Sequence, residues 1–243
     1  MPRNPAPWHL PAVVPDSQLS AELFEFLREL RKNNNREWFL ANKAYYESVV
    51  RDPLLRFIAE VGPRLRTISR HFQDGSMFRI YRDIRFSRDK SPYKTHAAAH
   101  FPHAASNRDV HAPGFYLHLE PGHCFAAAGL WHPDATTLEK VRRRIANRPG
   151  AWKAVLRRRL PIEGDRLSRP PRGYDPTHPH IEDLKLKDFI TRVTFSDAAV
   201  CSPRFPAVFV RACRTMSPLT EFLTKALNLG YSTGGKSAPA HSE

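Results

Sequence analysis

The spacing of apolar residues changes twice along the chain, and this order restricts the folds that the chain can adopt. Over residues 20–65 they recur every three or four positions, as on one face of a helix. Over 77–131 they alternate or form short runs bounded by turn residues, as in strands. Helical spacing returns after 136 and again over 204–229. Helices, then strands, then helices predict a single α+β domain, with a mostly antiparallel β-sheet packed against N-terminal and C-terminal helices.

Polar residues and prolines predict where the helices begin and end. Three asparagines at 33–35 end the first helix, and the last of them can cap the next one. Asp52-Pro53 predicts a new start, because a proline at the first helical position loses no hydrogen bond. Gly62-Pro63 is expected to kink or end that helix. Thr136 and Glu139 have the spacing of a capping box at the start of a later helix.

Strand patterning occupies the middle of the chain. Residues 78–86 alternate apolar and polar side chains, which predicts a strand with its phenylalanines and isoleucines on one face. Pro and Gly within 120–123 predict a tight turn that joins the segments on either side as a hairpin. The other predicted strands are 95–102, 114–120, 124–131 and 186–195.

The two ends of the chain and its cysteines indicate the domain boundaries and the cellular compartment. Residues 1–16 are rich in proline and 231–243 in small residues, so we expect two disordered ends around one domain over 17–230. No run approaches the roughly 18 apolar residues of a membrane helix. The first fifteen residues lack an apolar stretch of signal-peptide length, and three scattered cysteines make no disulfide framework. We expect a cytoplasmic protein without a membrane partner.

The segment 78–96 concentrates charge. Six cations and two carboxylates lie between Arg79 and Lys94. Arg82 falls on the apolar face of the predicted strand, between Ile80 and Ile84, where a guanidinium needs a carboxylate or a bound anion. Guanidinium, ammonium and hydroxyl groups together suit phosphate or carboxylate. An internal network of salt bridges is the alternative.

We therefore predict a basic pocket on the sheet that binds a small or polymeric anion, with phosphate as the expected group. The predicted ligand-binding residues are Arg79, Arg82, Arg85, Asp89, Lys90, Tyr93, Lys94, His96 and Tyr116. Alanine runs at 97–99 and 126–128 place small side chains on two strands, which leaves room for a ligand or for a closely packed helix. Trp38 and Trp131 are expected in the core or in the pocket wall.

An enzyme acting on a phosphorylated or carboxylated metabolite is the second hypothesis. His118 or Asp83 would be its acid–base group, since an imidazole titrates near neutral pH. Six histidines lie between residues 96 and 123. In a strand, only His96 and His100 of the first three share a face, and no carboxylate or cysteine stands at a recognised ligand spacing. We predict no metal and no cofactor.

A second basic region suggests a third hypothesis, a nucleic-acid-binding module. Residues 139–172 contain twelve basic and three acidic residues and so hold nine of the fourteen excess positive charges. Arg142, Arg143 and Arg144 could contact phosphates if they point outward from their helix. The segment contains no helix-turn-helix, zinc finger or aromatic RNA-binding run. A solvated helix face is the alternative.

The run FRIYRDIRFSRDKSPYKT over 78–95 resembles the signature of the domain-of-unknown-function family 2461. The similarity extends to shorter runs at 35–39, 114–121, 129–131 and 170–174, and it covers roughly residues 20–228. The resemblance implies membership of that family, a bacterial and fungal type of soluble protein. It defines no catalytic residues.

Overall fold

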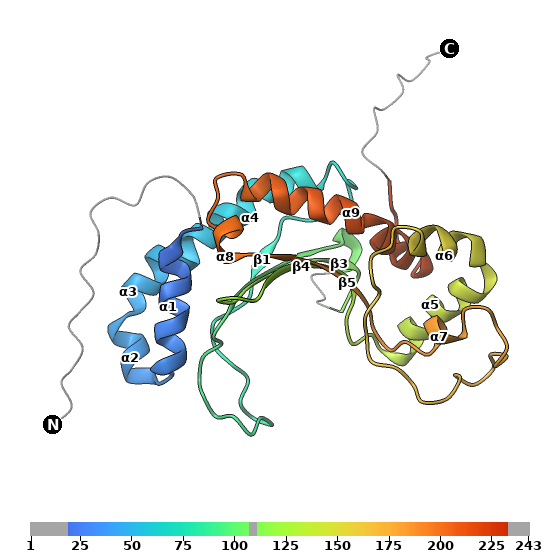
Figure 1. Cartoon of the computed structure of the whole chain (residues 1–243), viewed down its shortest axis with the longest axis horizontal. Helices are drawn as coiled ribbons and strands as arrows, with labels where there is room; N and C mark the ends of the chain where they lie inside the picture. Colours follow the sequence, from blue (N-terminus) through green and yellow to red (C-terminus); the bar gives the residue numbers. More distant parts are fainter. Residues whose placement is uncertain (1–18, 107–110, 233–243) are drawn as a thin grey trace, which may run out of the picture.

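The computed structural model describes residues 19–106 and 111–232, and these form an antiparallel five-stranded sheet with helices around it (Figure 1). The strands follow one another in the sheet in chain order. They are β1 (Ser76–Met77), β2 (Ala97–Pro102), β3 (Gly114–Leu119), β4 (Cys124–Leu130) and β5 (Phe189–Phe195). A short 3-10 helix, η2 (Ala104–Ser106), follows β2. The predicted α+β class is thus confirmed, whereas the expected arm at 1–16 and the tail beyond Ser232 lie outside the described residues.

Two long helices cover one face of the sheet. These are α4 (Asp52–Leu65) and α9 (Phe205–Ala226), which lie above the strands in Figure 1. Phe57 of α4 and Phe209 of α9 meet edge to face, with ring centroids 5.5 Å apart. Each such buried ring stabilises the fold by about 1.5–3 kcal/mol. The opposite face of the sheet is therefore the one available for a ligand.

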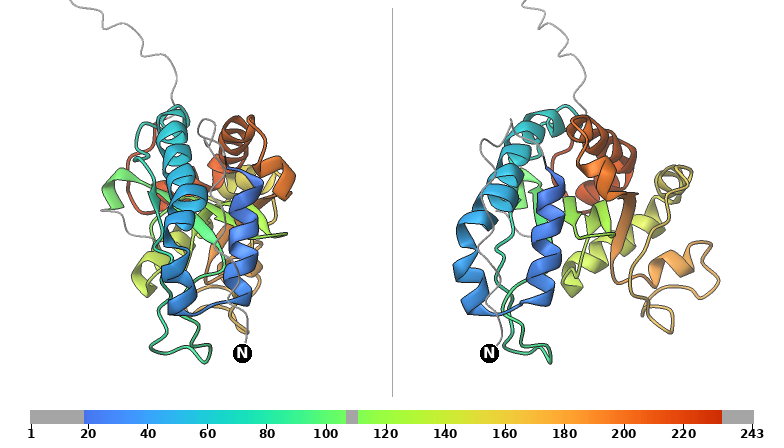
Figure 2. Two further views of the ribbon diagram at one scale, coloured as in Figure 1. Left: turned by 90° about the vertical axis from the view of Figure 1, so that its left-hand side faces the viewer. Right: turned by 60° about the vertical axis from the view of Figure 1, so that its left-hand side comes forward.

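The N-terminal helices form a separate layer at one end of the sheet (Figures 1 and 2). They are α1 (Ala21–Lys32), α2 (Arg36–Ala41), α3 (Lys43–Tyr46) and the π-helix η1 (Glu47–Arg51), which runs directly into α4. Asn35 caps α2 as predicted, because its Oδ1 accepts the backbone N–H of Trp38 at 2.9 Å. The expected end at Gly62-Pro63 is displaced, since α4 continues through Pro63 to Leu65.

A second apolar cluster lies beyond β5. Trp152 is its largest fully buried side chain, and the indole N–H donates to Asp183 at 2.8 Å. The surrounding helices are α5 (Ala135–Asn147), α6 (Pro149–Leu156) and α7 (Ile181–Leu184), whereas α8 (Asp197–Val200) follows β5. The cap of α5 is Asp134 and not Thr136, because the Asp134 carboxylate accepts the N–H of Thr137 at 2.8 Å.

The predicted strand over 78–86 is wrong. The sheet pairing ends at Met77, and residues 78–96 leave it as an irregular hairpin that extends away from α9 (Figure 1). One isolated bridge, Tyr81 to Tyr93, joins its two arms. Towards the tip the aspartates bond to the backbone: Asp83 accepts the N–H of Arg85, and Asp89 accepts that of Ser91. Such local bonds compete with strand pairing, and Phe86 at the tip is 96% exposed.

None of the helices in the described part of the chain combines the length and the apolar character needed to cross a membrane.

Candidate functional site

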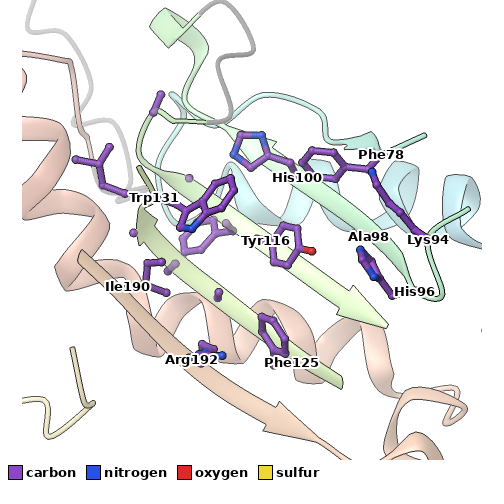
Figure 3. A pocket seen from close by; sticks show the side chains of 17 residues that line it. Phe78, Lys94, His96, Ala98, His100, Tyr116, Phe125, Trp131, Ile190 and Arg192 are labelled. Atoms are coloured by element: carbon purple, nitrogen blue, oxygen red, sulfur yellow. The ribbon is translucent and has the colours of Figure 1, made fainter. Parts of the chain in front are cut away.

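A cavity of about 550 Å³ lies on the face of the sheet that α4 and α9 leave uncovered (Figure 3). Its floor is made of small residues, among them Ala98, Ala127 and Gly129. The register places Ala127 beside Tyr116 on one side and Arg192 on the other, so these three side chains share a face. Ala97, Ala99 and Ala126 belong instead to the core under the helices. The two alanine runs therefore contribute to the cavity floor on one face and to the helix-covered core on the other.

Aromatic side chains form most of the cavity wall. Phe78, Tyr116, Phe125 and Trp131 line it (Figure 3). Trp131 is 54% exposed, and the ring of His111 stacks on it at 5.7 Å. An exposed indole at a cavity rim can cover the face of a planar ligand at little cost in conformational entropy.

Among the described residues, two cations reach the cavity, Lys94 and Arg192. Arg192 forms an ion pair with Glu163, and its guanidinium lies 5.4 Å from the Phe125 ring. Lys94 donates to the carbonyl of Arg79 at 3.0 Å and lies 5.4 Å from the Phe78 ring. Within the described residues it forms no ion pair with a carboxylate. Burial, and secondarily the charge of Arg79, lowers its pKa from the ordinary value of 10.5.

A hydrogen-bonded chain of polar side chains leads from the cavity to the β3–β4 turn. Tyr116 Oη lies 3.0 Å from Nδ1 of His118, and Nε2 of His118 lies 3.3 Å from Oε2 of Glu120. The His96 ring lies 4.4 Å from that of His118. Burial lowers the pKa of His96 to about 4 and lowers that of His118. Burial also raises the pKa of Tyr116 to about 12, so the side chains of His96 and Tyr116 are both uncharged at pH 7.

Of the predicted ligand-binding residues, Lys94, His96 and Tyr116 line the cavity. The other predicted cations, which do not line it, lie on the hairpin: Arg79, Arg82, Arg85 and Lys90. Arg82 pairs with Asp89, and Arg85 pairs with Asp83 at 2.7 Å. Lys90 donates to the carbonyl of Ile84 at 2.9 Å. The alternative of internal pairing thus describes Arg82 and Arg85, whereas Lys90 bonds to a backbone carbonyl.

The placements of three residues differ from expectation. Arg82 does not lie on a buried strand face, because its side chain is 36% exposed and the strand does not form. Asp83 is at the exposed part of the hairpin, where hydrogen bonds from Arg85 lower its pKa to about 2. Tyr93 is buried and stacks on Phe39 at 4.1 Å. Tyr93 therefore positions the hairpin and does not face the cavity.

Sequence reasoning missed several residues of the site. The alternation over 186–195 marks Arg192 as a polar position of a strand. The pattern does not show which strand pairs with it, so it does not place Arg192 near the cavity. Glu120 and His123 stand two and five residues after His118, across the predicted turn. His123 Nδ1 lies 3.5 Å from Oε2 of Glu120, so the turn brings the three side chains together.

The arginines proposed to contact nucleic acid do not share an outward face. Arg142 is buried, and it donates to the carbonyls of Leu184 at 2.8 Å and Leu186 at 3.2 Å. The expectation that it points outward is wrong, because its guanidinium is held by carbonyls at the end of α7 and just after it. Arg144 lies 5.3 Å from the ring of Phe222. Arg143 is exposed and lies 3.8 Å from Glu139.

Comparison with known proteins gives one result on family membership. A search of curated proteins found no match. A family model described as a conserved hypothetical protein, DUF2461, matches residues 22–222. That match includes the hairpin, every strand and nearly all of the helices described above. The chain therefore belongs to the DUF2461 family.

Proposed function

We propose that the cavity binds a small organic anion with a planar or otherwise apolar body, and that Lys94 receives its phosphate or carboxylate group. The observation that carries this proposal is Lys94 itself: within the described residues its ammonium lacks a carboxylate partner, and it lies among aromatic rings. A partly buried cation is costly unless an anion accompanies it. A ligand anion would fill that role.

The size and lining of the cavity suit a small molecule. About 550 Å³ lies within the range of roughly 300–1,000 Å³ that is typical of ligand sites. Figure 3 shows Lys94 and Arg192 on opposite sides, with Tyr116 between them. The floor of alanine and glycine allows a ligand to approach the sheet, and the aromatic wall supports a flat ring system.

The proposal differs from a general polyanion site. Two of the hairpin cations already have carboxylate partners, Asp89 for Arg82 and Asp83 for Arg85. Exposed pairs of this kind hold little free charge for a phosphate backbone. The cavity is concave and largely apolar, which favours one bound molecule over an extended polymer.

Calorimetric titration can test the proposal with two probe classes. Nucleoside monophosphates represent the phosphates, and indole and benzoate carboxylates represent the carboxylates. Lys94→Gln should weaken binding of the recognised class by about tenfold or more, the usual effect of losing a charge-assisted hydrogen bond of about 1.5–3 kcal/mol. Lys90→Gln is the matched control, because Lys90 belongs to the same hairpin and does not line the cavity.

Two results would overturn the proposal. One is that no member of either class binds the unaltered chain. The other is binding that Lys94→Gln leaves unchanged while circular dichroism shows both proteins folded.

A further inference from the structure

We propose that His118, Glu120 and His123 form a binding site for a divalent transition-metal ion of the zinc type. His118 belongs to β3, Glu120 follows its last residue, and His123 precedes β4. Each offers one ligand atom, and these atoms all lie within 4.8 Å of one another. Two imidazoles and a carboxylate are a donor set that zinc and its neighbours bind. This site lies beside the cavity and goes beyond the anion binding proposed for it.

Two of the distances between the donor atoms match the edges of a metal tetrahedron. Oε2 of Glu120 lies 3.3 Å from Nε2 of His118 and 3.5 Å from Nδ1 of His123. With metal–ligand bonds of about 2.0–2.1 Å, two ligands of a tetrahedral ion are roughly 3.3–3.4 Å apart. An ion can therefore enter with small side-chain movements.

Neighbouring groups orient the ligands as in established metal sites. Arg31 donates to Oε1 of Glu120 at 2.6 Å, which leaves Oε2 towards the two histidines. Tyr116 Oη can accept the Nδ1 proton of His118 at 3.0 Å, which leaves the lone pair of Nε2 for a metal. Phe125 stacks on the His118 ring at 4.7 Å and 14°. Phe125 restricts the ring plane of His118, and the Tyr116 hydroxyl can support the tautomer that leaves Nε2 unprotonated.

The turn itself fixes the spacing of the three ligands. The N–H of His123 donates to the carbonyl of Glu120 at 2.8 Å and closes the turn. Gly122 adopts φ +76°, a left-handed conformation that glycine tolerates. Its N–H also donates to Asp197 at 2.9 Å, which ties the turn to α8. The ligand set is therefore held by backbone contacts and does not depend on a flexible loop.

Three protein ligands leave a tetrahedral ion one open position. His96 lines the cavity, and its ring centroid lies 4.4 Å from that of His118. The cluster is thus adjacent to the proposed ligand site. An anion can bind to Lys94 with or without a metal, so the two proposals can fail separately.

Calorimetric titration with Zn²⁺ and absorption spectroscopy with Co²⁺ test the site. The full chain is prepared without a polyhistidine tag and treated with a chelator first. One ion should bind per chain, and Co²⁺ should give the intense visible bands of tetrahedral coordination. Glu120→Gln and His123→Ala should each lower the affinity at least a hundredfold. Tyr116→Phe should lower it by about 10–100-fold, as the loss of an outer contact does.

His132→Gln is the matched control, because His132 is exposed and lies outside the cluster. Its affinity should equal that of the unaltered chain, and far-ultraviolet circular dichroism should show every variant folded. The proposal is overturned if no ion binds, since Glu120 then only accepts hydrogen bonds from the two histidines. It is also overturned if folded Glu120→Gln and His123→Ala bind as tightly as the control.

Discussion

Tyr93 and Phe39 stack with ring centroids 4.1 Å apart and planes inclined by 22°, and this contact fixes the 78–96 hairpin against α2. Asn34 reinforces it from both sides. Its Oδ1 accepts the N–H of Tyr93 at 3.1 Å, and its Nδ2 donates to the Tyr93 carbonyl at 2.9 Å. Because Lys94 is the next residue, the same contact sets where the ammonium enters the cavity.

Replacing Asn34 with alanine should loosen the hairpin and weaken anion binding together. Two partly buried hydrogen bonds are lost, so the free energy of unfolding should fall by about 1–3 kcal/mol in urea titrations. Asn33→Ala is the control, because within the described residues the Asn33 side chain bonds to the carbonyl of Glu29 in the preceding helix and not to the hairpin. Faster amide exchange over 78–96 should accompany the change in Asn34→Ala. Equal exchange in both variants would show that Asn34 does not position the hairpin.

The cavity floor requires glycine at position 129. Gly129 adopts φ +141°, and an added Cβ would lie 1.9 Å from the carbonyl oxygen of Phe189. Gly129→Ala should therefore cost about 3 kcal/mol or more, measured as a loss of cooperative thermal unfolding. Gly150→Ala provides the contrast, because nothing lies within 4 Å of its added Cβ in α6. That variant should gain about 0.4–1 kcal/mol.

Much of the fold was predictable because the spacing of apolar residues along the chain indicates which side chains are buried. The strands from β2 to β5 alternate or run apolar, since one face packs under α4 and α9. Residues 78–86 alternate equally well, yet the pattern does not reveal whether a partner strand exists. There the local bonds of Asp83 and Asp89 replace a sheet partner.

The candidate site was predictable only where it follows from local pattern. Lys94, His96 and Tyr116 lie in or next to recognisable strands, and they reach the cavity. Arg192 lies at the cavity because β4 pairs with β5, and the register places Arg192 beside Ala127, which is far away in the sequence. Glu120 and His123 meet His118 only because a particular turn folds between them. Such three-dimensional pairings are absent from a single sequence.

Arg142 should behave as a structural residue and Arg143 as a surface residue. Arg142→Met keeps the apolar stem but removes charged hydrogen bonds to the carbonyls of Leu184 and Leu186. The expected loss is about 2–4 kcal/mol in the free energy of unfolding. Arg143→Met should change it by less than about 0.5 kcal/mol. Similar values for the two variants in urea titrations would contradict the burial of Arg142.

Anion binding should weaken at alkaline pH earlier than an ordinary lysine would allow. Burial, followed by the charge of Arg79, lowers the pKa of Lys94 from 10.5, so the ammonium is lost as pH rises towards that lowered value. Affinity for the recognised probe should therefore already decline at alkaline pH below 10.5, where an ordinary lysine keeps most of its charge, in calorimetric titrations. Lys94→Arg should retain its affinity for the probe over the same alkaline range, because a guanidinium remains charged there. A parallel decline in Lys94→Arg would assign the pH effect to another group.

Acidification should destabilise the fold partly through His103. This buried ring accepts the N–H of Ala105 at Nδ1, 3.2 Å away, and its Nε2 lies 2.6 Å from the carbonyl oxygen of Gly230. Both contacts are satisfied by the neutral Nε2–H tautomer. Burial lowers the pKa of His103 below 6.5, and the stacked His71 ring lowers it further, although the bond to Gly230 opposes the shift.

The sign follows from proton binding. Below about pH 6.5 the unfolded chain binds a proton at His103 that the folded chain still excludes, so stability present above pH 6.5 is lost as pH falls. One such group contributes a slope of at most about 1.4 kcal/mol per pH unit. Urea titrations between pH 7.5 and 5 should therefore show a shallower decline for His103→Gln than for the unaltered chain. Parallel curves would mean that His103 is protonated equally in the folded and unfolded states.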